Sequence, residues 1–153
     1  MDLILWRHAE AHVVKDGQTD LDRALTAKGE RHAQRMADWL NQRLAHSTRI
    51  LVSPALRCQQ TAKALGKNFK TVDALAPESS GEALLKVARW PESPDPVLVI
   101  GHQPTLGLVA AHLLADTPQE WSIKKGAVWW LRYRDREGLA RVVLQAVQSP
   151  EYL

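Results

Sequence analysis

Four side chains that can bind or attack a phosphate group follow short apolar runs in this sequence of 153 residues. They are Arg7 and His8 after LILW (3–6), Arg57 after RILV (49–52), and His102 after PVLVI (96–100). The planar guanidinium group of arginine pairs with phosphate or carboxylate oxygens two at a time. A neutral imidazole is a competent nucleophile toward phosphorus, and neighbouring arginine charges help to keep it neutral. The residue types therefore predict a site for a tetrahedral dianion, with His8 as the nucleophile of a phosphoryl transfer.

The three apolar runs are typical of strands that are buried on both faces of a parallel sheet. Segments with helical periodicity separate them, which predicts an α/β sandwich with a mostly parallel central sheet. In such open sheets ligands bind outside the carboxyl ends of the strands. We therefore expect the two arginines and two histidines to converge at one edge of the sheet, beside the N-termini of two helices that also favour anions.

Helix signals follow two of the strands. Apolar residues recur at spacings of three and four after Thr26, which predicts a helix beginning there. Ser53 is a natural N-cap, Pro54 suits a first helical turn and Gly66 suits a helix end. The other expected elements are helices over 80–90 and from Pro104 onward, a short strand near 70–75, a functional or mobile loop over 9–25, and a strand hairpin over 127–147.

Length and composition describe an ordinary globular protein. We expect one domain over 1–153, and 45% hydrophobic and 24% charged residues fit that class. The net charge of +3 favours anionic partners but is too small to indicate nucleic-acid binding. No apolar run is long enough for a membrane span, so we expect no membrane partner and a cytoplasmic location. Cys58, the lone cysteine, is expected to be a buried thiol, and Arg132, Arg134 and Arg136 a solvated strand face.

Four segments resemble the signature motifs of a known family. LILWRHAEA (3–11), LTAKG (25–29), LVSPALRCQQTA (51–62) and VLVIGHQPTLG (97–107) are similar to segments of the histidine phosphatase superfamily, and above all to its small SixA-type phosphohistidine phosphatases. The resemblance implies a three-layer α/β/α sandwich of the phosphoglycerate-mutase-like fold and a metal-independent phosphatase without a cofactor. It also implies a phosphohistidine intermediate on His8, with Arg7, Arg57 and His102 holding the phosphoryl group.

The sequence departs from the family pattern in two respects. Ala9 stands where the family has glycine, and we expect its methyl group to narrow the pocket slightly. The interval between Arg57 and His102 also leaves little room for the inserted lid that supplies a proton donor in larger members. Glu78 and Glu82 in this interval are possible proton donors, as is Glu10 after the first motif, but no pattern assigns the role to any of them.

The missing acid bears on the substrate. An alkoxide leaving group needs a proton in the transition state, and a positioned acid accelerates such reactions by about 10²–10⁴-fold. Imidazole leaves from phosphohistidine with less help, so the sequence favours a phosphohistidine-carrying protein, such as a histidine phosphotransfer domain, as the partner. A small phosphorylated molecule is the other candidate substrate.

Alternative functions remain at this point. One is a general phosphomonoesterase for small metabolites, and another is a non-catalytic module that binds a phosphoprotein and shields its phosphate. The nucleophile His8 favours an enzyme, because binding alone needs donors and no nucleophile. A zinc site at His8 and His12 is disfavoured by the neighbouring cations and by the lack of further ligands at a recognised spacing. We read His32, His46 and His112 as packing or surface residues.

Overall fold

Six strands form one mixed sheet in the computed structural model, which describes residues 1–153. Their order across the sheet is β3-β2-β4-β1-β5-β6. The first four run parallel, and β5 and β6 form an antiparallel hairpin at one edge. The strands are β1 (Asp2–Arg7), β2 (Arg49–Val52), β3 (Lys70–Thr71), β4 (Val97–Gly101), β5 (Val128–Arg136) and β6 (Leu139–Gln148). The predicted mostly parallel α/β sheet is confirmed.

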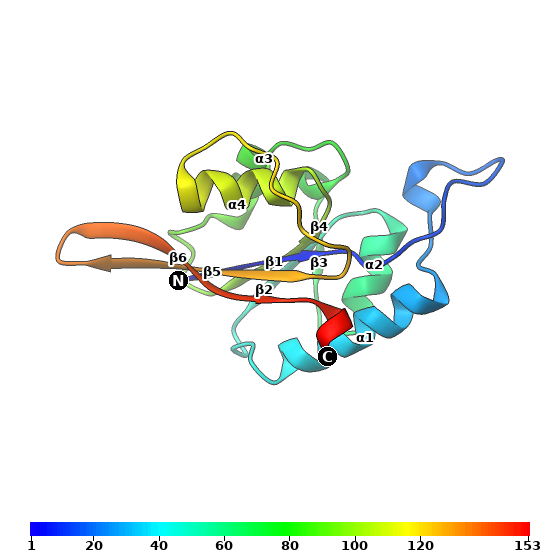
Figure 1. Ribbon diagram of the computed structural model, residues 1–153, viewed down its shortest axis with the longest axis horizontal. Coiled ribbons are helices and arrows are strands. Elements are labelled where there is room, and N and C mark those ends of the chain that lie inside the picture. Colours follow the sequence, from blue (N-terminus) through cyan, green and yellow to red (C-terminus); the bar gives the residue numbers. More distant parts are fainter.

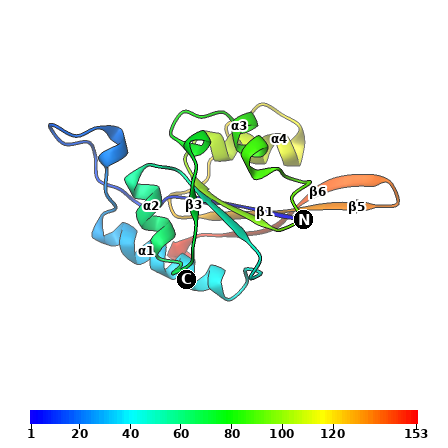
Figure 2. The same ribbon diagram turned by 180° about the vertical axis from the view of Figure 1, so that it is seen from behind.

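Four helices cover the two faces of this sheet (Figures 1 and 2). They are α1 (Ala27–Asn41), α2 (Leu56–Lys63), α3 (Gly81–Ala88) and α4 (Thr105–Ala115). One core cluster joins α1 and α2 to the sheet, and a second cluster joins α3 and α4 to the opposite face. The protein is therefore a three-layer α/β/α sandwich. None of its helices has the length and apolar character that crossing a lipid bilayer requires.

The central strand β1 explains how a short sequence supplies both cores. Successive side chains of a strand point to opposite faces, and all four residues of LILW are fully buried. Leu3 and Leu5 pack with α3 and α4, whereas Ile4 and Trp6 pack with α1 and α2. The continuous apolar run is thus the consequence of helices on both sides of the strand.

Helix α1 begins as the sequence predicts. Thr26 is its N-cap, and the Thr26 hydroxyl accepts a hydrogen bond from the backbone N–H of Gly29 at 2.9 Å. The Thr26 N–H donates to the carbonyl of Glu10 at 3.0 Å. The start of α1 is therefore attached to the segment that follows β1.

Helix α2 begins later than the sequence predicts. Ala55, not Ser53, is its N-cap, and the first helical residue is Leu56. The Ser53 hydroxyl accepts a long hydrogen bond from the Ala55 N–H at 3.2 Å and contacts a ring nitrogen of His102 at 2.7 Å. The N-cap prediction is wrong because this hydroxyl serves a partner that is distant in the sequence.

The hairpin of β5 and β6 extends past the amino-terminal end of β1 (Figure 1). Arg132 forms two hydrogen bonds to the Asp2 carboxylate, at 2.7 and 2.9 Å. Arg136, near the tip, is exposed, and Arg134 is half-buried. The expected solvated strand face therefore holds for the outer part of the hairpin, while Arg132 ties the hairpin to β1.

Candidate active site

The predicted convergence at the carboxyl ends of the strands is present in the structure. Arg7 is opposite Gly101 in the register of β1 and β4, so His8 and His102, the next residue of each chain segment, leave the sheet as neighbours. Their ring centroids are 5.3 Å apart. Arg57, in the first turn of α2, reaches both rings and is only 4% exposed.

The hydrogen bonds of His8 determine which ring nitrogen is free to react. Its Nδ1 lies 2.8 Å from the carbonyl oxygen of Ala9, which can only accept, so Nδ1 carries the hydrogen. The Nε2 atom accepts from Nε of Arg57 at 3.3 Å and therefore bears a lone pair. Burial, followed by the charges of His102, Arg57 and Arg7, lowers the pKa of His8 to about 3, although the bond to Ala9 opposes this. His8 is a neutral imidazole at pH 7, with its basic nitrogen beside a guanidinium group.

His102 is held through both ring nitrogens. Its Nδ1 accepts from an Nη atom of Arg57 at 3.3 Å, and its Nε2 lies 2.7 Å from Oγ of Ser53. Burial, and then the charge of Arg57, lowers the pKa of His102 to about 4, against the opposing charge of Asp20. The ring is therefore neutral in the free protein, and Nδ1 is the atom that can take up a proton when an anion adds negative charge.

Arg7 is the last residue of β1 and also lines the site. One of its Nη atoms donates to the carbonyl of Ile123 at 2.7 Å, which anchors the guanidinium group. The Nε atom of Arg7 is buried and has no acceptor within the protein. A buried donor without a partner carries a free-energy cost.

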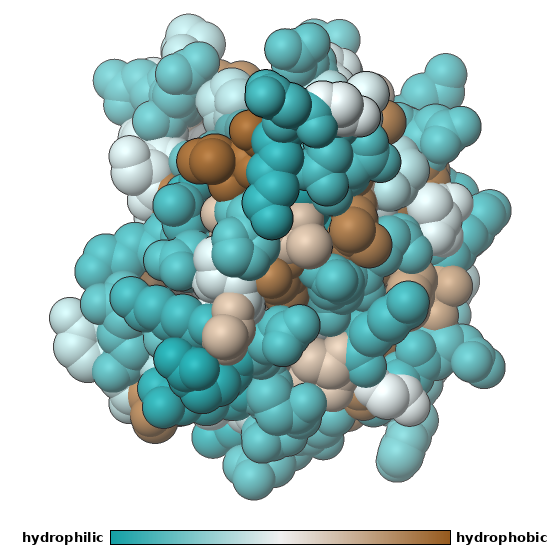
Figure 3. Space-filling model, turned by 90° about the vertical axis from the view of Figure 1, so that its right-hand side faces the viewer, coloured by the Kyte–Doolittle hydropathy of each residue, from teal (hydrophilic) through white to brown (hydrophobic).

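A cavity of about 330 Å³ opens between these side chains. Four cationic residues line it: Arg7, Arg23, Arg57 and Lys125. The two histidines, His8 and His102, also line it. Glu78 is the one carboxylate in the lining. The end of the molecule that holds the cavity is covered mostly by hydrophilic residues (Figure 3). This arrangement suits a small, multiply charged anion.

The three glutamates that the sequence suggested as proton donors lie in different places. Glu78 is at the exposed rim of the cavity, with a backbone φ of 71°. Glu82 is in the first turn of α3 and lines a separate groove between α3 and α4. The Glu10 carboxylate accepts a hydrogen bond from the Thr26 hydroxyl at 2.8 Å and lines a neighbouring hollow. Of the three, the structure brings Glu78 alone to the cavity.

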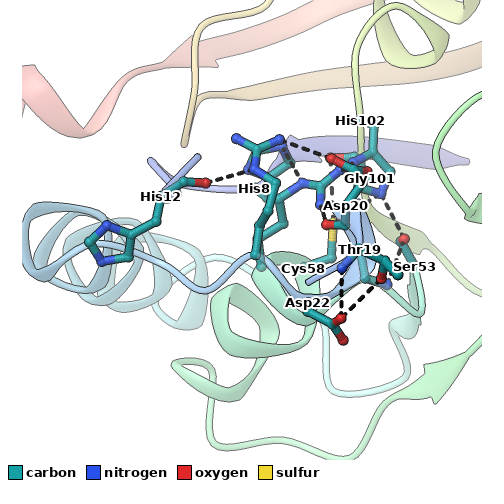
Figure 4. A network of polar contacts seen from close by, with 12 residues as sticks. His8, His12, Thr19, Asp20, Asp22, Ser53, Cys58, Gly101 and His102 are labelled. Atoms are coloured by element: carbon teal, nitrogen blue, oxygen red, sulfur yellow. Dashed lines mark hydrogen bonds and ion pairs between the residues drawn. The ribbon is translucent and has the colours of Figure 1, made fainter. Parts of the chain in front are cut away.

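Neither His12 nor Cys58 supplies a reactive side chain to the site. The side chain of His12 is exposed and points away from His8 (Figure 4), and its hydrogen bonds are made by the backbone, to Ala24 and from Nε of Arg23. Cys58 is fully buried, and burial raises the pKa of its thiol to about 12. Its sulfur, 3.5 Å from Nε2 of His102, is therefore a packed thiol and not a thiolate.

Ala9 does not narrow the cavity, contrary to expectation. Its side chain is fully buried in a small cluster with Leu25 and Ala33 and does not line the cavity. Its backbone N–H donates to the hydroxyl of Thr61 at 3.2 Å. The methyl group fills space between β1, α1 and α2, so the replacement of glycine contributes to packing.

Sequence reasoning missed Asp20, Arg23, Ser53 and Lys125 as parts of this site. Asp20, at the start of the turn η1 (Asp20–Asp22), places its carboxylate against Arg57 (Figure 4). Asp20 and Arg23 belong to the irregular 9–25 segment, and its length was the signal that it is functional. No periodicity or motif marks Lys125, which lies in the turn that leads into β5.

Comparison with known proteins agrees with the geometry. The family model of the histidine phosphatase superfamily (branch 1) matches residues 3–79. The chain is 38% identical over 150 residues to an uncharacterized protein of Picosynechococcus, covering 93% of this chain and 88% of that protein. It is 32% identical over 133 residues to the phosphohistidine phosphatase SixA of Escherichia coli, covering 77% and 78% of the two chains.

A solved structure extends the likeness to the whole fold. The protein histidine phosphatase SixA in complex with tungstate is 26% identical to this chain, with a TM-score of 0.77, and 99% of each chain is covered. The motifs, the fold and the relatives agree, and the chain belongs to the SixA-type branch of the histidine phosphatase superfamily.

Proposed function

We propose that this phosphatase hydrolyses phosphohistidine through a covalent intermediate on His8. The observation that carries the proposal is the unprotonated Nε2 of His8, whose lone pair accepts from Arg57 in a cavity lined by four cationic side chains. A neutral nucleophile in a cationic pocket suits attack on a phosphoryl dianion, because the pocket stabilises the anion without protonating the attacking nitrogen.

In the first step Nε2 of His8 attacks phosphorus. The new N–P bond forms as the P–N bond of the substrate breaks, and the bonding electron pair goes to the departing imidazole, which takes a proton from solvent. Charge spreads over the three equatorial oxygens in this transition state, so positioning and electrostatic stabilisation supply most of the catalysis. The hydrogen bond from Nδ1 of His8 to Ala9 keeps the ring oriented throughout.

The equatorial oxygens meet donors from three directions. Arg7 offers a guanidinium group that lines the cavity, and Arg57 offers one that already contacts both catalytic rings. His102, once protonated on Nδ1, adds a third cationic donor, with Ser53 holding its other nitrogen. In the second step a water oxygen attacks phosphorus, the N–P bond to His8 breaks, its electron pair returns to Nε2, and inorganic phosphate leaves.

The choice of phosphohistidine over phosphate esters is supported by the carboxylates. Glu78 lies at the exposed rim, and Asp20 contacts Arg57 and Arg23. Although partial burial opposes the change, hydrogen bonds from these two arginines lower the pKa of Asp20, so it is ionised and cannot donate a proton. An imidazole leaving group needs an acid least. The relative in Escherichia coli is named a phosphohistidine phosphatase, and the related SixA was solved with tungstate, a tetrahedral oxyanion.

Trapping the intermediate tests the catalytic role of His8. Mixing the protein with a ³²P-labelled phosphohistidine protein and quenching in alkaline detergent should leave label on His8. The His8→Ala variant should carry no label and should lose turnover with its fold intact. His12→Ala, which changes an exposed histidine of the same segment, is the matched control and should label normally. Labelling of the His8→Ala protein, or a wild-type protein that binds the substrate without labelling, would contradict the proposal.

Comparing two substrates tests the specificity. We expect kcat/KM for a phosphohistidine protein to exceed that for a simple alkyl phosphate by about 10²-fold or more, the usual contribution of the acid that an alkoxide would need. Equal values would identify a general phosphomonoesterase instead.

A further inference from the structure

Asp20 forms an ion pair with two arginines that line the cavity. Its Oδ2 lies 3.0 Å from an Nη atom of Arg57, and its Oδ1 lies 3.2 Å from an Nη atom of Arg23. Its backbone carbonyl accepts a further hydrogen bond from Arg57 at 2.8 Å. One residue therefore contacts both terminal nitrogens of Arg57 and also holds the neighbouring guanidinium group.

Arg57 depends on this partner. The guanidinium group is 4% exposed, and its other contacts are to the uncharged rings of His8 and His102. Asp20 supplies its one carboxylate within ion-pair distance. A buried cation left without an anion is strongly unfavourable, and a long side chain without a fixed partner samples several rotamers.

The carboxylate supports the arginines from outside the cavity. Arg23 and Arg57 both line the cavity, whereas Asp20 does not, and half of its side-chain surface is exposed. A phosphoryl group entering beside His8 thus meets the two guanidinium groups without displacing the carboxylate.

We propose that Asp20 is a positioning residue, which holds Arg57 and Arg23 in the orientation that the phosphoryl oxygens require in the transition state. The inference rests on the proposed role of Arg57 in phosphoryl transfer. The Asp20 carboxylate then has two opposing effects. Its charge opposes the binding of an anion, while its position aids the reaction. Removing the charge should therefore lower kcat without weakening the binding of phosphate.

The variant Asp20→Asn keeps the size of the side chain and removes the charge. We expect kcat to fall by about tenfold or more, as small displacements of positioning groups do. The inhibition constant of inorganic phosphate should stay equal or become smaller, since the cavity gains positive charge. Asp20→Glu, which keeps the carboxylate, should recover part of kcat.

Asp22→Asn is the matched control. Asp22 lies in the same turn η1, and its carboxylate contacts only the backbone N–H and hydroxyl of Thr19, at 3.0 Å each. The change in net charge is the same as in Asp20→Asn, but no arginine loses its partner. We therefore expect kcat and phosphate inhibition to match wild type, with folded fractions verified by circular dichroism. Three results would overturn the proposal: a kcat for Asp20→Asn within twofold of wild type or above it, a parallel loss of phosphate binding, or an equal loss in Asp22→Asn.

A second readout does not need activity. Hydrogen exchange at Nε of Arg57, followed by NMR, should become faster in Asp20→Asn and stay unchanged in Asp22→Asn. If exchange responds in this way while the wild-type protein does not hydrolyse phosphohistidine, the positioning role stands and the proposed substrate fails. Unchanged exchange in Asp20→Asn overturns the positioning role whatever the substrate.

Discussion

At the scale of single residues, the site depends on two histidines that burial keeps neutral. His8 and His102 have pKa values lowered to about 3 and about 4, first by burial and then by neighbouring charges. Neutrality is useful because an imidazole without its second proton can attack phosphorus or accept a proton as the anion binds. The same property makes the stability of the protein sensitive to acid.

The expected effect of pH on stability follows from proton linkage. Above about pH 6.5 both rings are neutral in the folded and the unfolded chain, so they contribute no pH dependence. Between about pH 6.5 and pH 4 the unfolded chain binds protons that the folded chain does not, so stability falls as pH falls, by up to about 1.4 kcal/mol per pH unit for each ring. Urea unfolding at pH 7.5 and pH 5 measures this slope.

Replacing the His8 side chain isolates the contribution of that ring to the pH dependence of stability. His8→Asn should make the loss of stability between pH 7.5 and pH 5 smaller, by up to about 1.4 kcal/mol per pH unit below about pH 6.5. The reason is that the asparagine side chain binds no proton in either the folded or the unfolded chain. An identical pH dependence in wild type and His8→Asn would show that His8 titrates alike in both states and would remove the basis for its neutrality.

At the scale of elements, the site depends on how α1 packs against the segment after β1. A Cβ atom at Gly29 would lie 2.0 Å from the carbonyl oxygen of Glu10, which is backbone and cannot rotate away. The glycine of LTAKG therefore permits close approach of the helix to the segment that carries His8 and Ala9. This explains why glycine stands in the first turn of a helix, where it is otherwise unfavourable.

The variant Gly29→Ala tests this contact. Alanine in place of glycine in a helix normally stabilises by about 1 kcal/mol, but here we expect destabilisation of about 1–3 kcal/mol, because the helix and the segment must separate. Urea unfolding measures the change, and kcat should fall as the His8 segment shifts. Glu30→Ala, at the next exposed position of α1, is the control and should change stability little. A more stable Gly29→Ala protein would show that the helix does not approach Glu10 this closely.

At the scale of the whole molecule, positive charge gathers at the end of the sheet that holds the cavity. Arg23 and Lys125 line the cavity, and Lys125 also lines an adjacent hollow with Lys28 and Arg35. A chain with a modest net charge of +3 therefore presents a locally cationic surface to an approaching anion. Such a field raises the rate of encounter with an anion and weakens as salt screens it.

Salt dependence tests this field. We expect kcat/KM for a phosphohistidine protein to fall severalfold between about 0.05 and 0.5 M NaCl, with a smaller change in kcat. Lys125→Gln should reduce the salt dependence. Arg136→Gln, near the hairpin tip at the opposite end of the strands, removes the same charge and should leave the dependence unchanged. Equal slopes for wild type and Lys125→Gln would contradict a steering role for this surface.

The sequence by itself determined the elements that carry a strong local signal. Runs such as LILW and PVLVI must be buried on both faces, and parallel strands bring the residues after them together, so His8 and His102 could be placed side by side without coordinates. The apolar periodicity and Thr26 located α1 for the same reason, since both act within one or two turns of the chain.

Only the tertiary structure decided which partners surround these residues. Ser53 has the local pattern of an N-cap, yet its hydroxyl contacts His102, and Asp20 reaches Arg57 from an irregular segment. A short polar side chain has the same local options in many folds, and its partner is selected by how distant backbone segments pack. Ala9 shows the same dependence, because its methyl group enters a cluster with Leu25 and Ala33 that exists only once α1 packs beside β1.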